Sequence, residues 1–170
     1  MFCPSPNCDE RPDTDIDLLV IHSISLPAGQ YGGSAIEDLF CNRLDCSADD
    51  NFRDLAGLKV SSHLLIRRCG ALIQFVPFSL RAWHAGKSCF EQRQRCNDFS
   101  IGIELEGTDS DQFTEQQYRV LAQATNAIRE RYPLITVERI VGHEHIAPLR
   151  KTDPGVGFDW TRYRAMLTTN

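Results

Sequence analysis

The chain has 170 residues, of which 42% are hydrophobic and 24% charged, and a formal net charge of −5. This length suits one domain whose single core buries about two thirds of the unfolded surface. The acidic balance argues against nucleic acid or an anionic membrane as the main partner, and no apolar run approaches the length of a membrane span. The N-terminus has no cationic start and no apolar segment typical of a signal peptide, so we expect a cytoplasmic protein.

The organisation is expected to be an N-terminal extension over residues 1–14, followed by one domain over 15–170. Apolar runs and alternating patterns predict strands, and their ranges are 18–24, 62–67, 71–77, 100–105 and 139–142. Arg-Cys-Gly at 68–70 predicts a hairpin turn between the second and third strands. Seven cysteines without CxxC spacing favour reduced thiols over a disulfide framework.

Helices are expected between and around these strands. The clearest begins at Thr114, which can form a capping box with Gln117, and ends before Pro133. Two more are predicted over 34–41 and from about Phe158 onward. Strands interspersed with helices indicate an α/β domain, and the hairpin predicts a mixed central sheet flanked by helices.

The segment 142–155 concentrates chemistry-bearing side chains in what the Gly and Pro residues predict to be an irregular loop. It contains His143, His145, Lys151 and Asp153. Imidazole and carboxylate groups suit Zn²⁺, and an irregular loop lets ligands ten positions apart converge on one ion. From spacing alone, metal binding and a solvated loop remain equal alternatives.

A metal site needs a further ligand from elsewhere in the chain. His22 lies in the C-terminal part of the predicted strand 18–24, the end at which open α/β sheets place their sites. His63 and His84 are the other candidate ligands. A histidine at a strand end is more often a hydrogen-bonded, semi-buried side chain, and His63 is expected to bond within the sheet. Two histidines and one carboxylate would leave a position open for water, as in a catalytic zinc site.

Alternation along the strand 100–105 places Gly102 and Glu104 on the face opposite the isoleucines. Glu104 is either a solvated side chain or a general base beside the metal. Lys151, two residues before Asp153, is either solvated or positioned to stabilise the negative charge that develops in amide hydrolysis. Trp83 suits either the core or the border of a sugar-binding cleft.

Six ordered blocks, taken together, resemble the AmpD branch of the N-acetylmuramoyl-L-alanine amidases, zinc enzymes related to T7 lysozyme and to peptidoglycan recognition proteins. The blocks are 20–27, 32–33, 60–66, 81–86, 96–108 and 143–155. The resemblance implies the amidase fold of those proteins. It also implies cleavage of the amide between the lactyl group of 1,6-anhydro-N-acetylmuramic acid and L-alanine, in cytoplasmic recycling of cell-wall fragments, with consequences for β-lactamase induction in some bacteria.

Residue roles follow from the same resemblance. It implies zinc ligands at His22, His143 and Asp153, which leaves His145 outside the ligand set. It further implies that Glu104 assists the water and that Lys151 stabilises the oxyanion.

The substrate implied is a small anhydromuropeptide, with Trp83 and Arg95 bordering its sugar and peptide, and no obligate protein partner is evident. Two positions depart from the branch. Ser23 stands where Asn is common, and Lys59 stands where an Arg helps to hold the stem-peptide carboxylates. Lys cannot reproduce a bidentate guanidinium contact, so these changes put the tightness of peptide selection in doubt.

Two other classes of protein compete with this interpretation. A non-catalytic peptidoglycan-binding module would lack a zinc ligand, whereas all three ligand positions are filled here. A cysteine hydrolase would use one of the seven thiols, but none stands in a recognisable nucleophile motif.

Overall fold

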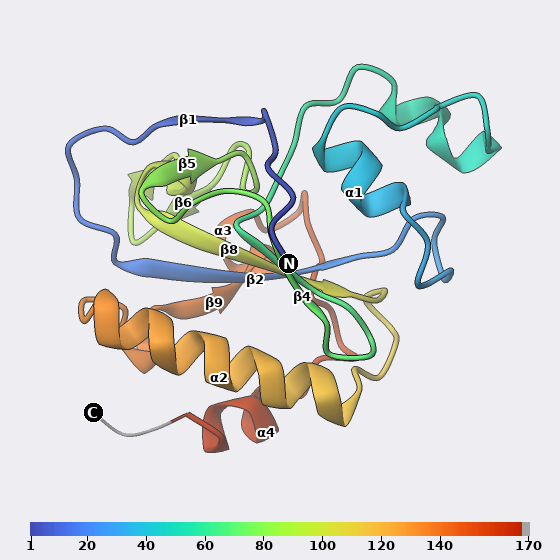
Figure 1. Ribbon diagram of the computed structural model, residues 1–170. Coiled ribbons are helices and arrows are strands. Elements are labelled where there is room, and N and C mark those ends of the chain that lie inside the picture. The colour runs from blue at the N-terminus through green and yellow to red at the C-terminus, as the bar shows by residue number, and fades with distance from the viewer. Residues whose placement is uncertain (168–170) are drawn as a thin grey trace.

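A five-stranded mixed sheet in the order β4-β3-β8-β2-β9 forms the centre of the computed structural model, which describes residues 1–167 (Figure 1). Its strands are β2 (Leu18–Ile24), β3 (Leu64–Ile66), β4 (Leu72–Gln74), β8 (Ser100–Glu106) and β9 (Ile140–Gly142). Every neighbouring pair is parallel except β3 and β4, which form the predicted hairpin. The α/β class and the mixed sheet are therefore confirmed.

The helices are α1 (Ala35–Phe40), α2 (Glu115–Arg131), α3 (His143–Ile146) and α4 (Trp160–Ala165), with short 3-10 turns at Asp50–Leu55, Cys96–Asp98 and Val137–Arg139. The predicted capping box is present, because the Gln117 amide donates to Thr114 Oγ1 at 3.2 Å and the Thr114 amide donates to Gln117 Oε1 at 3.0 Å. Within residues 1–167, no helix is both long and apolar enough to cross a bilayer.

One short helix was not predicted. The expectation of an irregular segment over 142–155 was wrong at its start, where α3 occupies His143–Ile146. The physical reason is local: the Gly142 amide donates to His145 Nδ1 at 2.9 Å, which caps this single helical turn.

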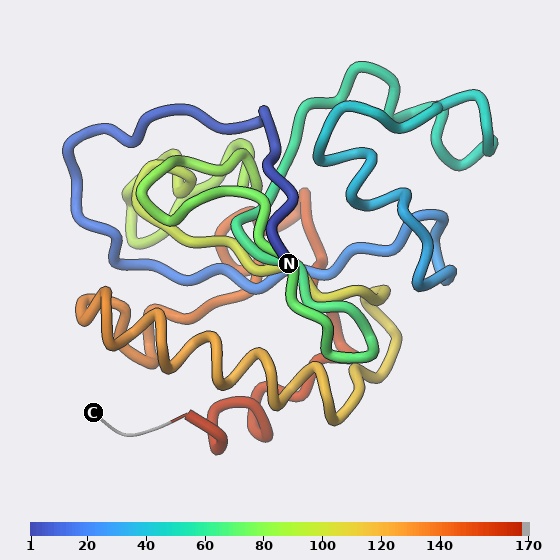
Figure 2. Tube along the Cα trace, in the orientation of Figure 1, coloured from blue at the N-terminus to red at the C-terminus, as the bar shows by residue number. Residues whose placement is uncertain are grey.

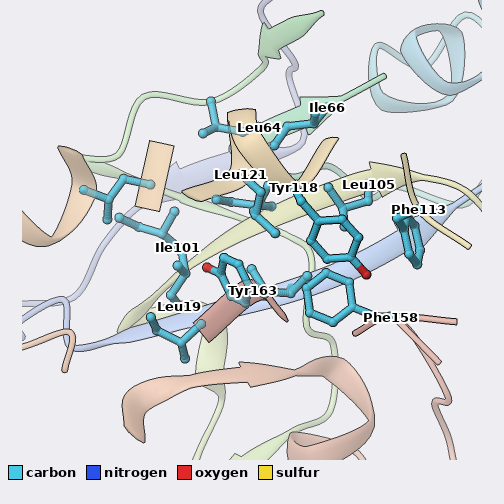
Figure 3. Close-up of a cluster of buried hydrophobic side chains, with 14 of the residues drawn as sticks. Leu19, Leu64, Ile66, Ile101, Leu105, Phe113, Tyr118, Leu121, Phe158 and Tyr163 are labelled. Carbon is cyan, nitrogen blue, oxygen red and sulfur yellow. The ribbon is translucent and has the colours of Figure 1, made fainter. Parts of the chain in front are cut away.

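Both faces of the sheet are buried. On one face, Leu19 of β2 and Ile101 of β8 pack against α2, through side chains that include Tyr118 and Leu121 (Figure 3). On the other face lie two short strand pairs, β1 (Cys8–Glu10) with β5 (Leu80–Ala82) and β6 (Cys89–Phe90) with β7 (Arg93–Gln94). In Figure 1, α2 and α4 lie on one side of the sheet and β1, β5 and β6 on the other. The functional side chains lie on the second side.

The N-terminal segment first runs along the edge strand β4, where Phe2 forms a bridge with Gln74. It then continues through β1 on the second side of the sheet, and Figure 2 follows its trace into β2. The amides of Cys3 and Ser5 donate to the carbonyls of Gln74 and Phe75, at 2.8 and 3.0 Å. The expected boundary at residue 14 stays a prediction, and the last three residues of the expected domain, 168–170, lie outside the described residues.

Arg11 joins this segment to the strand β8 region. Its guanidinium donates to four backbone carbonyls, those of Phe78, Asn97, Asp98 and Ser100, at 2.7 to 3.1 Å. Burial lowers its pKa to about 10. The segment before residue 14 is therefore bonded to the same strand that carries Glu104.

We expect Arg11→Ala to lower the free energy of unfolding by about 3 kcal/mol, because several partly buried carbonyls lose a charged donor. Denaturant unfolding measures the change, with Arg53→Ala as the control, since Arg53 is 73% exposed and its ion pair is with Asp50, itself exposed. A loss below about 1 kcal/mol in Arg11→Ala would show that the segment contributes little to the fold.

Candidate metal centre and active site

Parallel pairing brings the candidate residues to one end of the sheet. His22 of β2 and Glu104 of β8 are direct register partners. On the other side of β2, Gly142 of β9 pairs with Ile21, so His143 emerges next to His22. Parallel strands end at the same sheet edge, which explains why residues more than a hundred positions apart meet there.

Asp153 completes the group from the segment after α3. Its carbonyl accepts the Glu144 amide at 2.9 Å, which ties this segment to the first turn of α3. Its Oδ2 lies 3.0 Å from His22 Nδ1 and 3.0 Å from His143 Nδ1, and the two Nδ1 atoms are also 3.0 Å apart. Three potential metal-ligand atoms, from β2, α3 and the segment after α3, thus converge on one point. They are called the donor group below.

This donor set fits a metal ion. Zinc bonds of about 2.0–2.1 Å in a tetrahedral site place neighbouring ligand atoms about 3.3 Å apart, close to the separation found here. Two imidazole nitrogens and a carboxylate oxygen are ligands of the type that zinc accepts. Burial lowers the pKa of His22 to about 4, which keeps that imidazole neutral and able to ligate. Burial raises the pKa of Asp153, but close polar contacts with His143 and His22 outweigh it and hold this pKa below its usual range.

Glu104 lies beside these donors with one oxygen unpaired. Among the described residues, its Oε2 is buried and has no hydrogen-bond partner. Burial, and then the negative charge of Asp153, raise its pKa well above the usual value, while Lys151 lowers it. A carboxyl group whose pKa is raised can both accept and release a proton during a reaction.

Glu106, two residues further along the same face of β8, provides a contrast. Its carboxylate accepts from the Gly32 amide at 2.7 Å, the Arg68 amide at 3.1 Å and the Arg67 guanidinium at 2.5 Å. It is therefore fully partnered and structural. The sequence pattern placed both glutamates on one face, but only hydrogen bonding distinguishes their roles.

A cavity of about 230 Å³ opens over the donors. Its polar lining includes His22, Ser23, Glu104, His143, Lys151 and Asp153, and its apolar wall comes from α1 and the segment after it, including Leu39, Leu55, Leu58 and Val60. Lys151 is exposed and Ser23 half-buried. The structure thus brings six of the nine predicted site residues into one cavity.

The other three predicted residues lie outside that cavity. Trp83 is half-buried, and its indole N–H donates to Asp9 Oδ1 at 3.1 Å. Arg95 lines a neighbouring cavity of about 400 Å³. Lys59 lines another cavity, one that shares Leu55 and Leu58 with the metal cavity. Their roles in substrate binding stay predictions.

The remaining histidines are not part of the donor group. His145 lies outside it, as the resemblance implied. His63 Nδ1 accepts the Gly102 amide at 3.0 Å, which confirms that it bonds within the sheet. His84 contacts His22 Nε2 at 2.9 Å, behind the donor atoms. His84 was predicted only as a candidate ligand. Its supporting contact with His22 could not be predicted, because chain spacing does not show which imidazole nitrogen faces the site.

These groups define a hydrolytic site, in which a candidate metal centre adjoins a carboxyl group suited to proton transfer. A sequence model of the N-acetylmuramoyl-L-alanine amidases matches residues 12–156. The chain belongs to this amidase family.

Relatives and solved structures agree with that assignment. The chain is 55% identical over 166 residues to the 1,6-anhydro-N-acetylmuramyl-L-alanine amidase AmpD of Citrobacter freundii, covering 97% of this chain and 88% of the relative. Its structure is similar to the crystal structure of a selenomethionine derivative of AmpD, with a TM-score of 0.96, 54% identity, and coverage of 98% of this chain and 93% of the other. A more distant similarity is to the amidase AmiD from E. coli, with a TM-score of 0.66, 28% identity, and coverage of 94% and 65%. The amidase fold expected from the sequence is confirmed.

Proposed function

We propose that this protein is a zinc amidase that cleaves the amide between the lactyl group of 1,6-anhydro-N-acetylmuramic acid and L-alanine in peptidoglycan recycling. The observation that carries the proposal is the convergence of three ligand atoms beside the unpaired Glu104 carboxyl. The AmpD relatives are named for this reaction, and AmiD was solved with anhydro-N-acetylmuramic acid-L-Ala-D-γ-Glu-L-Lys. Both support a small anhydromuropeptide as substrate.

His22, His143 and Asp153 would hold the ion. When bound, zinc supplies Lewis acidity that polarises the amide carbonyl and acidifies water. These three residues line the same cavity as Glu104 and Lys151, so the scissile amide of a bound substrate would meet all five side chains there.

Glu104 is proposed to accept, at its unpaired Oε2, the proton released by the attacking water. It then delivers that proton to the nitrogen of the departing L-alanine, since one carboxyl with a raised pKa can serve both steps. Lys151 is proposed to stabilise the negative charge that develops on the carbonyl oxygen, because its side chain lines the same cavity.

Ser23, Lys59, Trp83 and Arg95 are proposed to contact the rest of the substrate. Ser23 lines the metal cavity, and its hydroxyl donates to Asp109 Oδ1 at 3.2 Å. Arg95 and Lys59 line other cavities and Trp83 is half-buried, all outside the metal cavity, so we assign these three to sugar and stem-peptide contacts rather than to the chemistry. The cytoplasm as compartment and a consequence for β-lactamase induction belong to the same proposal, and cell fractionation tests the first of these.

Substrate choice tests the recycling role. The purified enzyme should cleave anhydro-N-acetylmuramyl-tripeptide at least about tenfold faster, in kcat/KM, than the reducing N-acetylmuramyl-tripeptide, and should release little from intact sacculi. We expect this preference because the AmpD relatives are named for the 1,6-anhydro sugar. Chromatographic quantification of released peptide measures all three rates. Equal rates would leave a general peptidoglycan amidase.

A further inference from the structure

Both candidate metal histidines are held from behind by consecutive residues of one segment. His22 Nε2 lies 2.9 Å from His84 Nδ1, and His143 Nε2 lies 3.1 Å from the Ala85 carbonyl oxygen. In each histidine, Nδ1 is the atom that faces Asp153. Whether each Nδ1 is protonated therefore depends on whether the partner of Nε2 accepts a hydrogen bond or donates one.

For His143 the assignment is direct. A carbonyl oxygen can only accept, so His143 Nε2 carries the proton and donates it to Ala85. Arg150 Nη2 lies further away, at 3.5 Å, and directs its two protons to the Ala85 and Lys87 carbonyls at 2.8 and 2.7 Å, so it does not compete for this nitrogen. A neutral imidazole has one N–H, which leaves His143 Nδ1 with a free lone pair. His22 differs, because its partner is another imidazole, which can donate or accept.

A further hydrogen bond resolves this ambiguity. The Ser100 hydroxyl lies 2.6 Å from the Cys96 carbonyl oxygen and donates its only proton there. Ser100 Oγ can then only accept from His84 Nε2, at 3.1 Å. If His84 is neutral, its Nδ1 must accept from His22 Nε2, and His22 Nδ1 is left unprotonated.

The surroundings of His84 favour its neutral form. The side chain is buried, and its two ring nitrogens contact His22 and Ser100 rather than a carboxylate. A buried imidazolium without an anionic partner is unfavourable, so the neutral ring fits this environment.

Contacts with Gly102 and Asn97 fix the position of the His84 imidazole. A Cβ at Gly102 would lie 2.5 Å from His84 Cγ, so only glycine on β8 leaves room for the ring. Asn97 Oδ1 accepts the amides of both His84 and Ala85, at 3.2 and 2.7 Å. These contacts fix the segment that contacts both metal histidines.

We propose that His84 and Ser100 form a hydrogen-bond relay that sets the tautomer of His22, so that His22 Nδ1 presents a lone pair to the metal. His84 is thus a positioning residue, and Ser100 Oγ accepts the hydrogen bond from its Nε2–H. With both histidines in this tautomer, two lone pairs and the Asp153 carboxylate face one point, an arrangement that a cation stabilises. The inference rests on the proposed zinc site.

Zinc affinity tests the relay. In Ser100→Ala, His84 Nε2–H loses its acceptor, so His84 can carry its proton on Nδ1 instead. His84 Nδ1 then donates to His22 Nε2, and the proton of His22 moves to His22 Nδ1. We expect zinc to bind about 10- to 100-fold more weakly, as is typical when a hydrogen bond behind a ligand is lost. Competition with a chelator of known affinity measures the dissociation constant. Ser62→Ala is the matched control, because Ser62 is equally buried and its hydroxyl also bonds a backbone carbonyl, that of Leu64.

Nuclear magnetic resonance gives a second readout that does not depend on activity or on the stability of a variant. Long-range ¹H–¹⁵N correlation on the metal-free wild-type protein should show His84 protonated at Nε2, and Ser100→Ala should shift it towards Nδ1. His84 protonated at Nδ1 in the wild type would overturn the relay, as would a zinc affinity in Ser100→Ala equal to that of Ser62→Ala. If the wild type itself bound no zinc, the proposed function would fail instead, and the tautomer of His84 would still decide the relay.

Discussion

His22→Ala, His143→Ala and Asp153→Ala are each expected to lose bound zinc and to lower kcat/KM by at least about a thousandfold, the scale of losing an indispensable catalytic group. Each variant leaves two of three donors that now lie 3.0 Å apart. Metal analysis of the purified proteins measures zinc per chain, and the wild type should carry about one ion.

His145→Asn is the matched control for these variants, because Asn Oδ1 can accept the Gly142 amide in place of His145 Nδ1 and so keep the contact that caps α3. His145 lies on the same helical turn as His143, but its side chain is half-exposed and lies outside the donor group. It should keep its zinc. Chelation of the wild type should abolish activity, and added zinc should restore it. Full activity without metal, or normal zinc content in His22→Ala, would contradict the assigned site.

The sequence predicted the long elements of the fold well. The strand expected over 18–24 has those bounds, and the helix expected from Thr114 to Pro133 runs over Glu115–Arg131. Both have strong local causes: an apolar run buried on two faces in one case, and a capping box with a proline stop in the other.

The short elements could not be predicted in the same way. The strands β1, β5, β6 and β7 have two or three residues each, too few to show a period of two. Their pairing is set by contacts between distant segments, such as Cys8 opposite Ala82. The turn α3 depends on a single capping contact from His145.

The candidate site could also be predicted only in part. Residue types and family resemblance predicted the donor group, whereas the contacts that hold its histidines in place depend on three-dimensional packing. Nothing in the spacing of Gly102 and His84 shows that one makes room for the other. Likewise, the strand pattern treats Glu104 and Glu106 alike, and only the structure shows which carboxyl is unpaired.

Glu104→Gln and Lys151→Ala are each expected to lower kcat by at least about a hundredfold while zinc stays bound, the usual scale for a proton-transfer group or an oxyanion donor. Neither side chain is among the three donors, so metal content should stay at the wild-type value. Steady-state kinetics on anhydro-N-acetylmuramyl-tripeptide, with metal analysis of the same samples, separates catalysis from zinc binding.

Glu106→Gln is the matched control for Glu104→Gln, because both glutamates lie on one face of β8 and the substitution is the same. Glu104 Oε2 has no described partner to lose, so Glu104→Gln should change the free energy of unfolding by less than about 1 kcal/mol. Glu106→Gln weakens the bond with Arg67 and should cost about 2 kcal/mol. We therefore expect opposite profiles: lost turnover with stability kept at Glu104, and lost stability at Glu106 with turnover that stays within about tenfold of the wild type in the folded fraction. Near-normal turnover in Glu104→Gln would remove Glu104 from the reaction, and the proton would then need another carrier in the cavity.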